Sequence, residues 1–487
     1  MANTEITASS RIPVRTKTLY GAGSIATGVK DTAFNVFLLF YYTQVVGLSG
    51  SLAGAAIFTA LVMDAASDPL VGYWSDRFHS RWGRRHPFIY ASALPMGIAF
   101  YFLFNPPEDA AQNMLFAWML IFAVLVRFFM TFYAVPSSAL NAEMTSDYDE
   151  RTSLSGFRVL LGWLGGLAFA TTGYLVLFVP NETYEDGRMD PTAYQDFALL
   201  GGVLIVASIL ICAIGTHHLI PKLKQVSEQA SESLGLRQDF SNMLHNKPFL
   251  ILVCIIFVTA TATGFTDVIG LYMFTYFWEL STDQLAVITF AALLGTLAAF
   301  FSAPLLSKRY DKRPVAIAAG ILVMCCYPIC IALRLADMLP ENGDPAVLLI
   351  LCGNATLTVY AAVTMTILFV SMIADTIDNN ELMTGRRQEA IYSSAFTFSM
   401  KATSGLGGFI AGIALDVVGF PTGAEAAAVS QATLDSLGIA VAVIIFFFWC
   451  LTLLTLRTYP MSRADHEQIL AAIAERRGAE QATPVTE

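Results

Sequence analysis

Two acidic residues lie inside an apolar run that is long enough to cross a membrane. Asp64 and Asp68 belong to the run from about residue 52 to residue 75, and about 20 apolar residues span a bilayer as a helix. Positions i, i+3 and i+4 share one helical face, so Ser67 brings a hydroxyl to the same place. One charge at the centre of a spanning helix costs about 2.5–3.5 kcal/mol, so two on one face require a cation, protons or basic partners. We expect a cation or proton site, and the alternative is charge pairing that only holds helices together.

A hydroxyl from another apolar run can join this pair. Thr131 lies in the run 114–138, one helical turn after Arg127, and can offer its oxygen to the two carboxylates. The alternative is that Thr131 bonds to its own helix, as threonines in spans commonly do. We interpret Arg127 as structural, and Asp267 in the run 248–278 has no predicted role.

Further charged residues inside apolar runs suit a polar ligand. Lys30 and Asp31 are adjacent and therefore about 100° apart around a helix, so we expect each to find its partner elsewhere rather than to neutralise the other. Arg158 and Lys401 are cationic donors in two later runs, and Thr397 lies one turn before Lys401. A carboxylate accepts hydrogen bonds from neighbouring hydroxyls while Arg and Lys donate them, so the set predicts a polyhydroxylated ligand. A structural charge network is the alternative for each residue.

The composition is that of a membrane protein. Of 487 residues, 55% are apolar and 14% are charged, and the mean hydropathy is +0.59, which is too apolar for a water-soluble globule of this size. A window of about 19 residues finds twelve apolar runs, so we expect an all-α integral membrane protein with twelve transmembrane helices. The runs lie at about 19–47, 52–75, 88–104, 114–138, 153–178, 195–219, 248–278, 283–306, 314–336, 345–374, 389–418 and 432–456.

The basic residues predict the orientation. Of the 28 lysines and arginines, 22 lie in the N-terminal segment, in alternate loops and in the C-terminal tail, while the opposite loops hold Arg188. The positive-inside rule therefore places both termini in the cytoplasm, with the protein as a multi-pass component of the cell (inner) membrane.

Several other classes of function are disfavoured. Lysines and arginines lie at the membrane edge, where topology alone requires them, so the chain has no nucleic-acid footprint despite its net charge of −10. The six histidines lie in loops or at the ends of runs, and the seven cysteines lie in runs, so we expect neither a transition-metal site nor disulfides. H-E-x-x-H and G-x-S-x-G motifs are missing, so we expect no enzyme and no cofactor. The expected partners are a small-molecule substrate and the bilayer, and we expect a monomer.

The chain consists of two similar halves. SDRFHSRWGRRHP after the second run has a degenerate counterpart in SKRYDKRP after the eighth, and NAEMTSDYDERTS after the fourth resembles ADTIDNNELMTGRRQE after the tenth. Two parallel six-helix repeats with a substrate site between them are typical of the major facilitator fold. We expect an N-terminal half at 1–219, a cytoplasmic loop at 220–247, a C-terminal half at 248–456 and a cytoplasmic tail at 457–487. The tail predicts a short amphipathic helix on the inner surface, without a chemical role.

The polar loop after the second run carries candidate gate residues. Asp76, Arg84 and Arg85 lie in this loop, which Pro87 ends before the next run. When two halves rock about a central site, such charges fasten the inner helix ends while the site faces outward. Their candidate partners are Glu143, Asp147 and Asp375.

These motifs together resemble one family of transporters. GVKD at 28–31, DAASDPLVG at 64–72, HSRWGRRHP at 79–87, ADTID at 374–378 and RRQEAIYSS at 386–394 are similar to the glycoside-pentoside-hexuronide:cation symporters, which include the melibiose transporters. The resemblance implies cation-coupled symport of a glycoside, sugar or sugar acid by alternating access. It assigns the cation to Asp64, Ser67, Asp68 and Thr131, and the substrate to Lys30, Asp31, Arg158, Thr397 and Lys401.

The sequence also departs from this family at several positions. Ser67 replaces an asparagine, Ala134 stands where melibiose transporters have a second sugar-binding aspartate, and Ser138 and Thr366 stand where they have tryptophans. The galactoside pocket is therefore not reproduced, and a more amphipathic ligand such as a lysolipid, or an uncoupled facilitator, remain alternatives. The resemblance and the Thr131 hydroxyl favour Na⁺ as the coupling ion, with H⁺ or Li⁺ as alternatives, because two close carboxylates can also share a proton.

Overall fold

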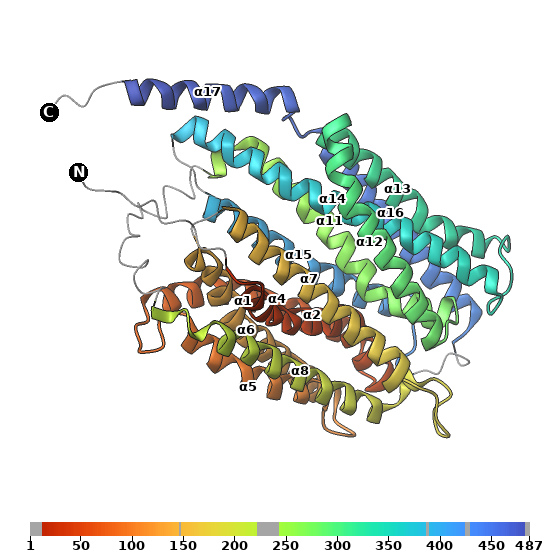
Figure 1. Cartoon of the computed structure of the whole chain (residues 1–487). Coiled ribbons are helices and arrows are strands. Elements are labelled where there is room, and N and C mark those ends of the chain that lie inside the picture. The colour runs from red at the N-terminus through yellow and green to blue at the C-terminus, as the bar shows by residue number, and fades with distance from the viewer. Residues whose placement is uncertain (1–11, 146–147, 222–242, 386–388, 424–428, 483–487) are drawn as a thin grey trace. The chain divides into compact units, whose positions relative to one another are not determined.

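The computed structural model describes residues 12–145, 148–221, 243–385, 389–423 and 429–482 (Figure 1). Within these ranges the chain is helical and forms no strand. The α-helices are α1 (Val14–Ala22), α2 (Ser24–Thr32), α3 (Leu38–Phe40), α4 (Gly50–Arg77), α5 (His86–Leu103), α6 (Gln112–Met144), α7 (Tyr148–Thr172), α8 (Pro191–His217), α11 (Lys247–Tyr272), α12 (Thr282–Tyr310), α13 (Lys312–Leu335), α14 (Pro345–Thr384), α15 (Glu389–Val417), α16 (Gln431–Arg457) and α17 (Arg463–Ala482). Short π-helical turns are η1 (Ala33–Phe37), η2 (Tyr41–Val45), η3 (Gly173–Leu177) and η5 (Met273–Phe277), and η4 (Gly187–Met189) is a 3₁₀ turn.

The helices agree with the predicted membrane spans. In the described part of the chain, ten helices are long and apolar enough to cross a bilayer. The other two expected crossings fall on the segment from α1 to η2 and on α15, whose apolar portion is Gly405–Val417. The predicted all-α integral membrane architecture is confirmed.

The chain divides into two compact units. The N-terminal unit comprises Met1–Ser231 with Pro421–Glu425, and the C-terminal unit comprises Glu232–Phe420 with Ala426–Glu487. In the N-terminal unit α6 packs against α4 and α5, α8 packs against α5, and α7 packs against α2. In the C-terminal unit α14 packs against α12 and α13, α15 packs against α11, and α16 packs against α13.

A close helix crossing positions the charged residues of α2. A Cβ atom added at Gly28 would lie 2.0 Å from the carbonyl oxygen of Gly162 and 2.6 Å from the amide nitrogen of Gly166 on α7. Only glycine allows the two backbones to approach this closely. The crossing places Lys30 and Asp31, which lie two and three residues after Gly28, beside α7.

Helix α14 extends beyond the predicted apolar run. The run ends near residue 374, whereas the helix continues to Thr384 and ends at Gly385, whose φ of 74° is the left-handed conformation typical of a helix C-terminus. The amide of Gly385 donates to the carbonyl of Glu381 at 2.7 Å. Asp375 and Asp378 therefore lie on a helix.

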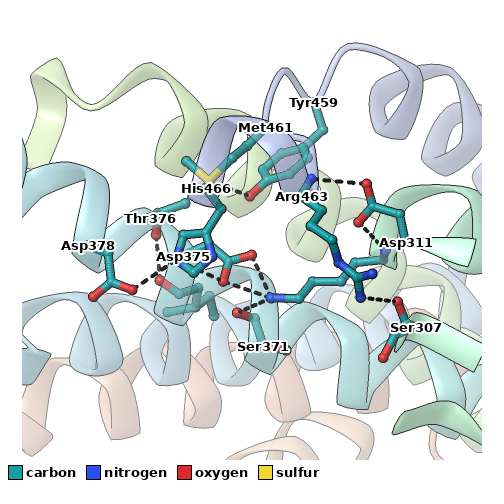
Figure 2. A network of polar contacts seen from close by, with 12 residues as sticks. Ser307, Asp311, Ser371, Asp375, Thr376, Asp378, Tyr459, Met461, Arg463 and His466 are labelled. Carbon is teal, nitrogen blue, oxygen red and sulfur yellow. Dashed lines mark hydrogen bonds and ion pairs between the residues drawn. The ribbon is translucent and has the colours of Figure 1, made fainter. Parts of the chain in front are cut away.

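The C-terminal tail forms a helix that is attached to the C-terminal unit by polar contacts (Figure 2). Two nitrogens of the Arg463 guanidinium donate to the carbonyls of Lys308 (2.8 Å) and Ser307 (3.1 Å) at the end of α12. The backbone amide of Arg463 donates to Asp311 Oδ2 at 3.0 Å, and His466 Nε2 lies 3.0 Å from Asp378 Oδ2 on α14. The sequence predicts this helix but not that it binds to the ends of two spans.

Candidate functional site

The two intramembrane acids meet the predicted hydroxyls in the N-terminal unit. Thr131 Oγ1 on α6 lies 2.8 Å from Asp64 Oδ1 and 2.9 Å from Asp68 Oδ1 on α4. Ser67 Oγ lies 3.3 Å from Thr131 Oγ1 and donates to the carbonyl of Asp64 at 2.9 Å. Asp64 and Thr131 are buried, with 5% and 1% of their surface exposed, and Asp68 is half-buried. The structure brings all four predicted cation-site residues together.

The cluster around Thr131 has more acceptor oxygens than its hydroxyl group can satisfy. The Thr131 hydroxyl has one hydrogen but lies within hydrogen-bonding distance of two carboxylate oxygens and of the carbonyl of Arg127 at 3.3 Å. It can donate to one acceptor at a time. The arrangement therefore offers several oxygen ligands to one small positive species, and oxygens are the ligands that hard cations prefer.

Arg127 belongs to the same cluster. Its Nη1 lies 3.5 Å from Asp64 Oδ2, and its guanidinium carbon lies 4.7 Å from the centre of the Phe34 ring. Arg127 is 5% exposed, and its Nε has no hydrogen-bond partner among the described residues. This ion pair offsets the negative charge of Asp64. The alternative interpretation, in which charge pairing holds helices together, therefore applies in part to Asp64.

The predicted substrate residues of the N-terminal unit lie on α2 and α7. Lys30 Nζ forms an ion pair with Asp31 Oδ1, so the expectation that these neighbours do not neutralise each other is wrong. The flexible four-carbon stem of lysine allows its ammonium group to bend back to the next residue. Half of the Asp31 side chain remains exposed and can accept further hydrogen bonds.

Arg158 on α7 is held by three hydroxyl groups. Its Nε, Nη1 and Nη2 donate at 3.4 Å to Ser24 Oγ, Tyr20 OH and Ser137 Oγ. These contacts are long, and they leave the fork of the guanidinium free to reorient toward a ligand. Thr397 and Lys401 lie on α15, and their side chains are outside what the structure describes.

Three predicted gate residues form an ion-pair cluster with Glu143. Arg84 Nη2 and Arg85 Nε contact Glu143 Oε1 at 3.0 and 3.1 Å. Arg85 Nη2 also contacts Asp76 Oδ1 at 2.5 Å, and its Nη1 donates to Ser75 Oγ at 2.8 Å. The cluster joins the end of α4, the loop after it and the end of α6 within the N-terminal unit.

The remaining gate candidates lie elsewhere. Asp375 is in the C-terminal unit, where Lys312 Nζ contacts its two oxygens at 2.7 and 2.6 Å, and His466 Nε2 lies 3.6 Å from its Oδ1 (Figure 2). Asp147 lies outside the described residues.

Comparison with known proteins identifies the family. A family model described as "MFS/sugar transport protein" matches residues 19–463. The chain belongs to this family. The putative glycoside/cation symporter YagG of Escherichia coli strain K12 is 25% identical, with 97% of each chain covered. The isoprimeverose transporter of Lactiplantibacillus pentosus is 23% identical, covering 84% of this chain and 81% of that protein.

A solved structure has the same fold. The inward open conformation of the xylose transporter XylE from E. coli aligns with a TM-score of 0.58 and 13% identity, covering 93% of this chain and 98% of that one. Together with the family match, this confirms a multi-pass transporter of the major facilitator superfamily, and it confirms the resemblance to glycoside:cation symporters.

The ion pair with Asp64 agrees with the structural interpretation of Arg127, and it also places this residue beside the cation cluster. It lies four residues before Thr131 on α6, so it shares the helical face that Thr131 presents to α4. This spacing is the sequence signal that places Arg127 near the two carboxylates. At the positions where melibiose transporters have tryptophans, Ser138 and Thr366 are exposed and bond to carbonyls of their own helices at 2.8 and 3.0 Å.

Proposed function

We propose that this transporter couples the inward movement of a cation to the uptake of a sugar or glycoside by alternating access. The observation that carries the proposal is the cluster of Asp64, Asp68, Thr131 and Ser67, whose oxygens converge inside the membrane span. Two acids within a span are costly unless they serve ion binding or pairing, and Arg127 pairs with one of them. Na⁺ suits a cluster that includes hydroxyl oxygens, and H⁺ is the alternative.

A polyhydroxylated substrate is supported by the relatives and by the charges on α2 and α7. One relative bears the name of a putative glycoside/cation symporter and another that of an isoprimeverose transporter. Asp31 offers a half-exposed carboxylate, and Arg158 offers a guanidinium held by long contacts. Because Ser138 and Thr366 provide no aromatic ring for stacking, we place the substrate outside the galactosides.

The proposal also includes the side of the membrane on which the gate cluster lies. With both termini in the cytoplasm, the cluster of Asp76, Arg84, Arg85 and Glu143 lies at the inner end of the N-terminal unit. We assign it to the inner gate that is fastened when the substrate site faces outward.

Uptake by proteoliposomes tests the coupling. Purified protein is reconstituted, and uptake of radiolabelled xylosides and glucosides is measured with an inward Na⁺ gradient, with an inward H⁺ gradient and with neither. We expect Na⁺ to drive accumulation above the outside concentration. If the substrate only reached equal concentrations on both sides under all three conditions, the protein would be an uncoupled facilitator. Accumulation driven by the H⁺ gradient alone would show that the coupling ion is H⁺ and not Na⁺.

A matched variant controls for general damage. Asp435 is partly exposed near the start of α16 in the C-terminal unit and accepts a hydrogen bond from Gln431 at 2.9 Å. Asp435→Asn removes one carboxylate from the chain, so we expect it to transport like the wild type. Asp68→Asn should abolish accumulation.

A further inference from the structure

Helix α11 exposes a polar stripe within a membrane span. From Ala260 to Tyr272 its side chains are buried except for Thr263 and Asp267, which are exposed, and Thr266, which is half-buried. Thr263 and Asp267 are four residues apart, so they lie on one helical face. In the second half of this helix, these three residues are the ones whose side chains are accessible.

The position of Asp267 excludes a lipid-facing role. The span Lys247–Phe277 begins 20 residues before Asp267 and ends 10 residues after it, so at 1.5 Å per residue the carboxylate lies about 15 Å from the nearer end. An ionised side chain facing hydrocarbon at this depth is costly, and such residues normally face a water-filled cavity or the interior of a bundle. The accessible face of Asp267 is therefore directed at water or a ligand.

The surroundings of Asp267 leave its carboxylate available. The described side chains give it no hydrogen bond or ion pair. Thr263 donates its hydroxyl hydrogen to the carbonyl of Thr259 at 3.0 Å, which leaves its oxygen lone pairs for another donor. Tyr327 on α13 lies near enough for its phenol to interact electrostatically with Asp267.

Helix α11 also packs tightly against the helix that carries predicted substrate residues. A Cβ atom added at Gly407 on α15 would lie 2.3 Å from the amide nitrogen of Phe265 and 2.4 Å from the carbonyl oxygen of Thr261. The backbones of α11 and α15 are therefore in direct contact one turn from Asp267. Thr397 and Lys401 lie on the same helix α15.

We propose that Asp267 is a substrate-binding residue of the C-terminal unit and that its carboxylate accepts hydrogen bonds from the hydroxyls of a neutral sugar or glycoside. The inference rests on the proposed function and narrows its substrate class. A carboxylate attracts hydroxyl donors but repels the carboxylate of a sugar acid, so Asp267 favours neutral glycosides over hexuronides.

Calorimetry with a matched pair of ligands tests this assignment. Methyl β-glucoside and methyl β-xyloside are the neutral probes, and methyl β-glucuronide is the acidic one. Asp267→Asn should weaken binding of the better neutral probe about tenfold to a hundredfold, as expected for the loss of one charged hydrogen-bond partner. The same variant should reduce the preference for the neutral probe over the glucuronide.

Controls distinguish a binding role from a structural one. Asp435→Asn should bind all probes like the wild type, and the thermal midpoint of Asp267→Asn should equal or exceed that of the wild type, because no described contact is lost. Wild-type affinity and selectivity in Asp267→Asn would overturn the inference while leaving the proposed function intact. A lowered thermal midpoint with unchanged selectivity among the probes would also overturn it, since Asp267 would then be structural. Failure of the wild-type protein to bind any of the probes would instead contradict the proposed substrate class, and the inference with it.

Discussion

Replacing Asp68 or Asp64 by asparagine should affect ion coupling alike but stability differently. Asp64 is buried and ion-paired with Arg127 at 3.5 Å, whereas Asp68 is half-buried. Removing one partner of a buried ion pair costs about 3–5 kcal/mol. Because the Nη1–Oδ2 distance is long and the new amide oxygen can still accept from Arg127, we expect about 1–3 kcal/mol for Asp64→Asn. We expect a smaller change for Asp68→Asn.

The effect on transport follows from the membrane potential. One positive charge moving inward gains about 2.3 kcal/mol per 100 mV, which sustains about fiftyfold accumulation of a neutral substrate. Each asparagine variant removes a carboxylate that contacts Thr131, so we expect accumulation to fall to simple equilibration in both. Exchange of labelled for unlabelled substrate should continue in Asp68→Asn, because exchange needs no net ion movement.

Two measurements check this reasoning. Uptake at an imposed potential of about 100 mV gives the accumulation ratio, and thermal unfolding of the purified variants gives the change in stability. Unchanged accumulation in both variants would refute the cation site. Equal thermal midpoints for the two variants would show that the contact between Asp64 and Arg127 adds nothing to stability.

Further changes probe the other clusters. Arg158→Ala should weaken substrate binding more than tenfold in calorimetry, since it removes a charged donor, while Arg158→Lys should recover part of the loss; wild-type affinity would assign Arg158 to the structural network. Arg85→Ala removes contacts to Asp76, Glu143 and Ser75, which should favour opening of the inner gate. Labelling of cysteine thiols by a reagent added from the inner side should therefore be faster, whereas the control Arg81→Ala should change the labelling rate little. An unchanged labelling rate would limit the loop to a role in topology. Arg463→Ala should lower stability by about 1 kcal/mol and speed hydrogen exchange in α17, with exposed Glu467→Gln as the control; identical exchange rates would contradict the attachment of α17 to α12.

The predictable part of the site follows from helical periodicity. Asp64, Ser67 and Asp68 share a face because of their spacing alone, and hydropathy is sufficient to place that face inside a span. Thr131 comes from a distant helix; its position on the face of Arg127 makes it a candidate, and the family resemblance assigns it to the cation. The orientation of Arg127 toward Asp64 depends on how α6 packs against α4, which the sequence does not specify.

Two differences between the sequence patterns and the structure have physical causes. The 100° separation of Lys30 and Asp31 describes Cβ directions, but a long lysine side chain reaches beyond its own helical sector. The apolar run of α14 ends near residue 374 because hydropathy falls at Asp375, whereas the helix itself continues to Thr384, before Gly385. Hydropathy locates the membrane, and the end of a helix depends on its capping residues.

The attachment of α17 affects how the protein can be shortened or fused. Arg463 binds the last carbonyls of α12, and Asp311, which has a φ of 72°, caps α13 while it also accepts from the Arg463 amide. A reporter domain joined directly after Arg457 would displace these contacts and expose the ends of two spans. A fusion placed after Ala482 keeps the tail helix complete, and proteins shortened to the last span should be harder to purify in a folded form.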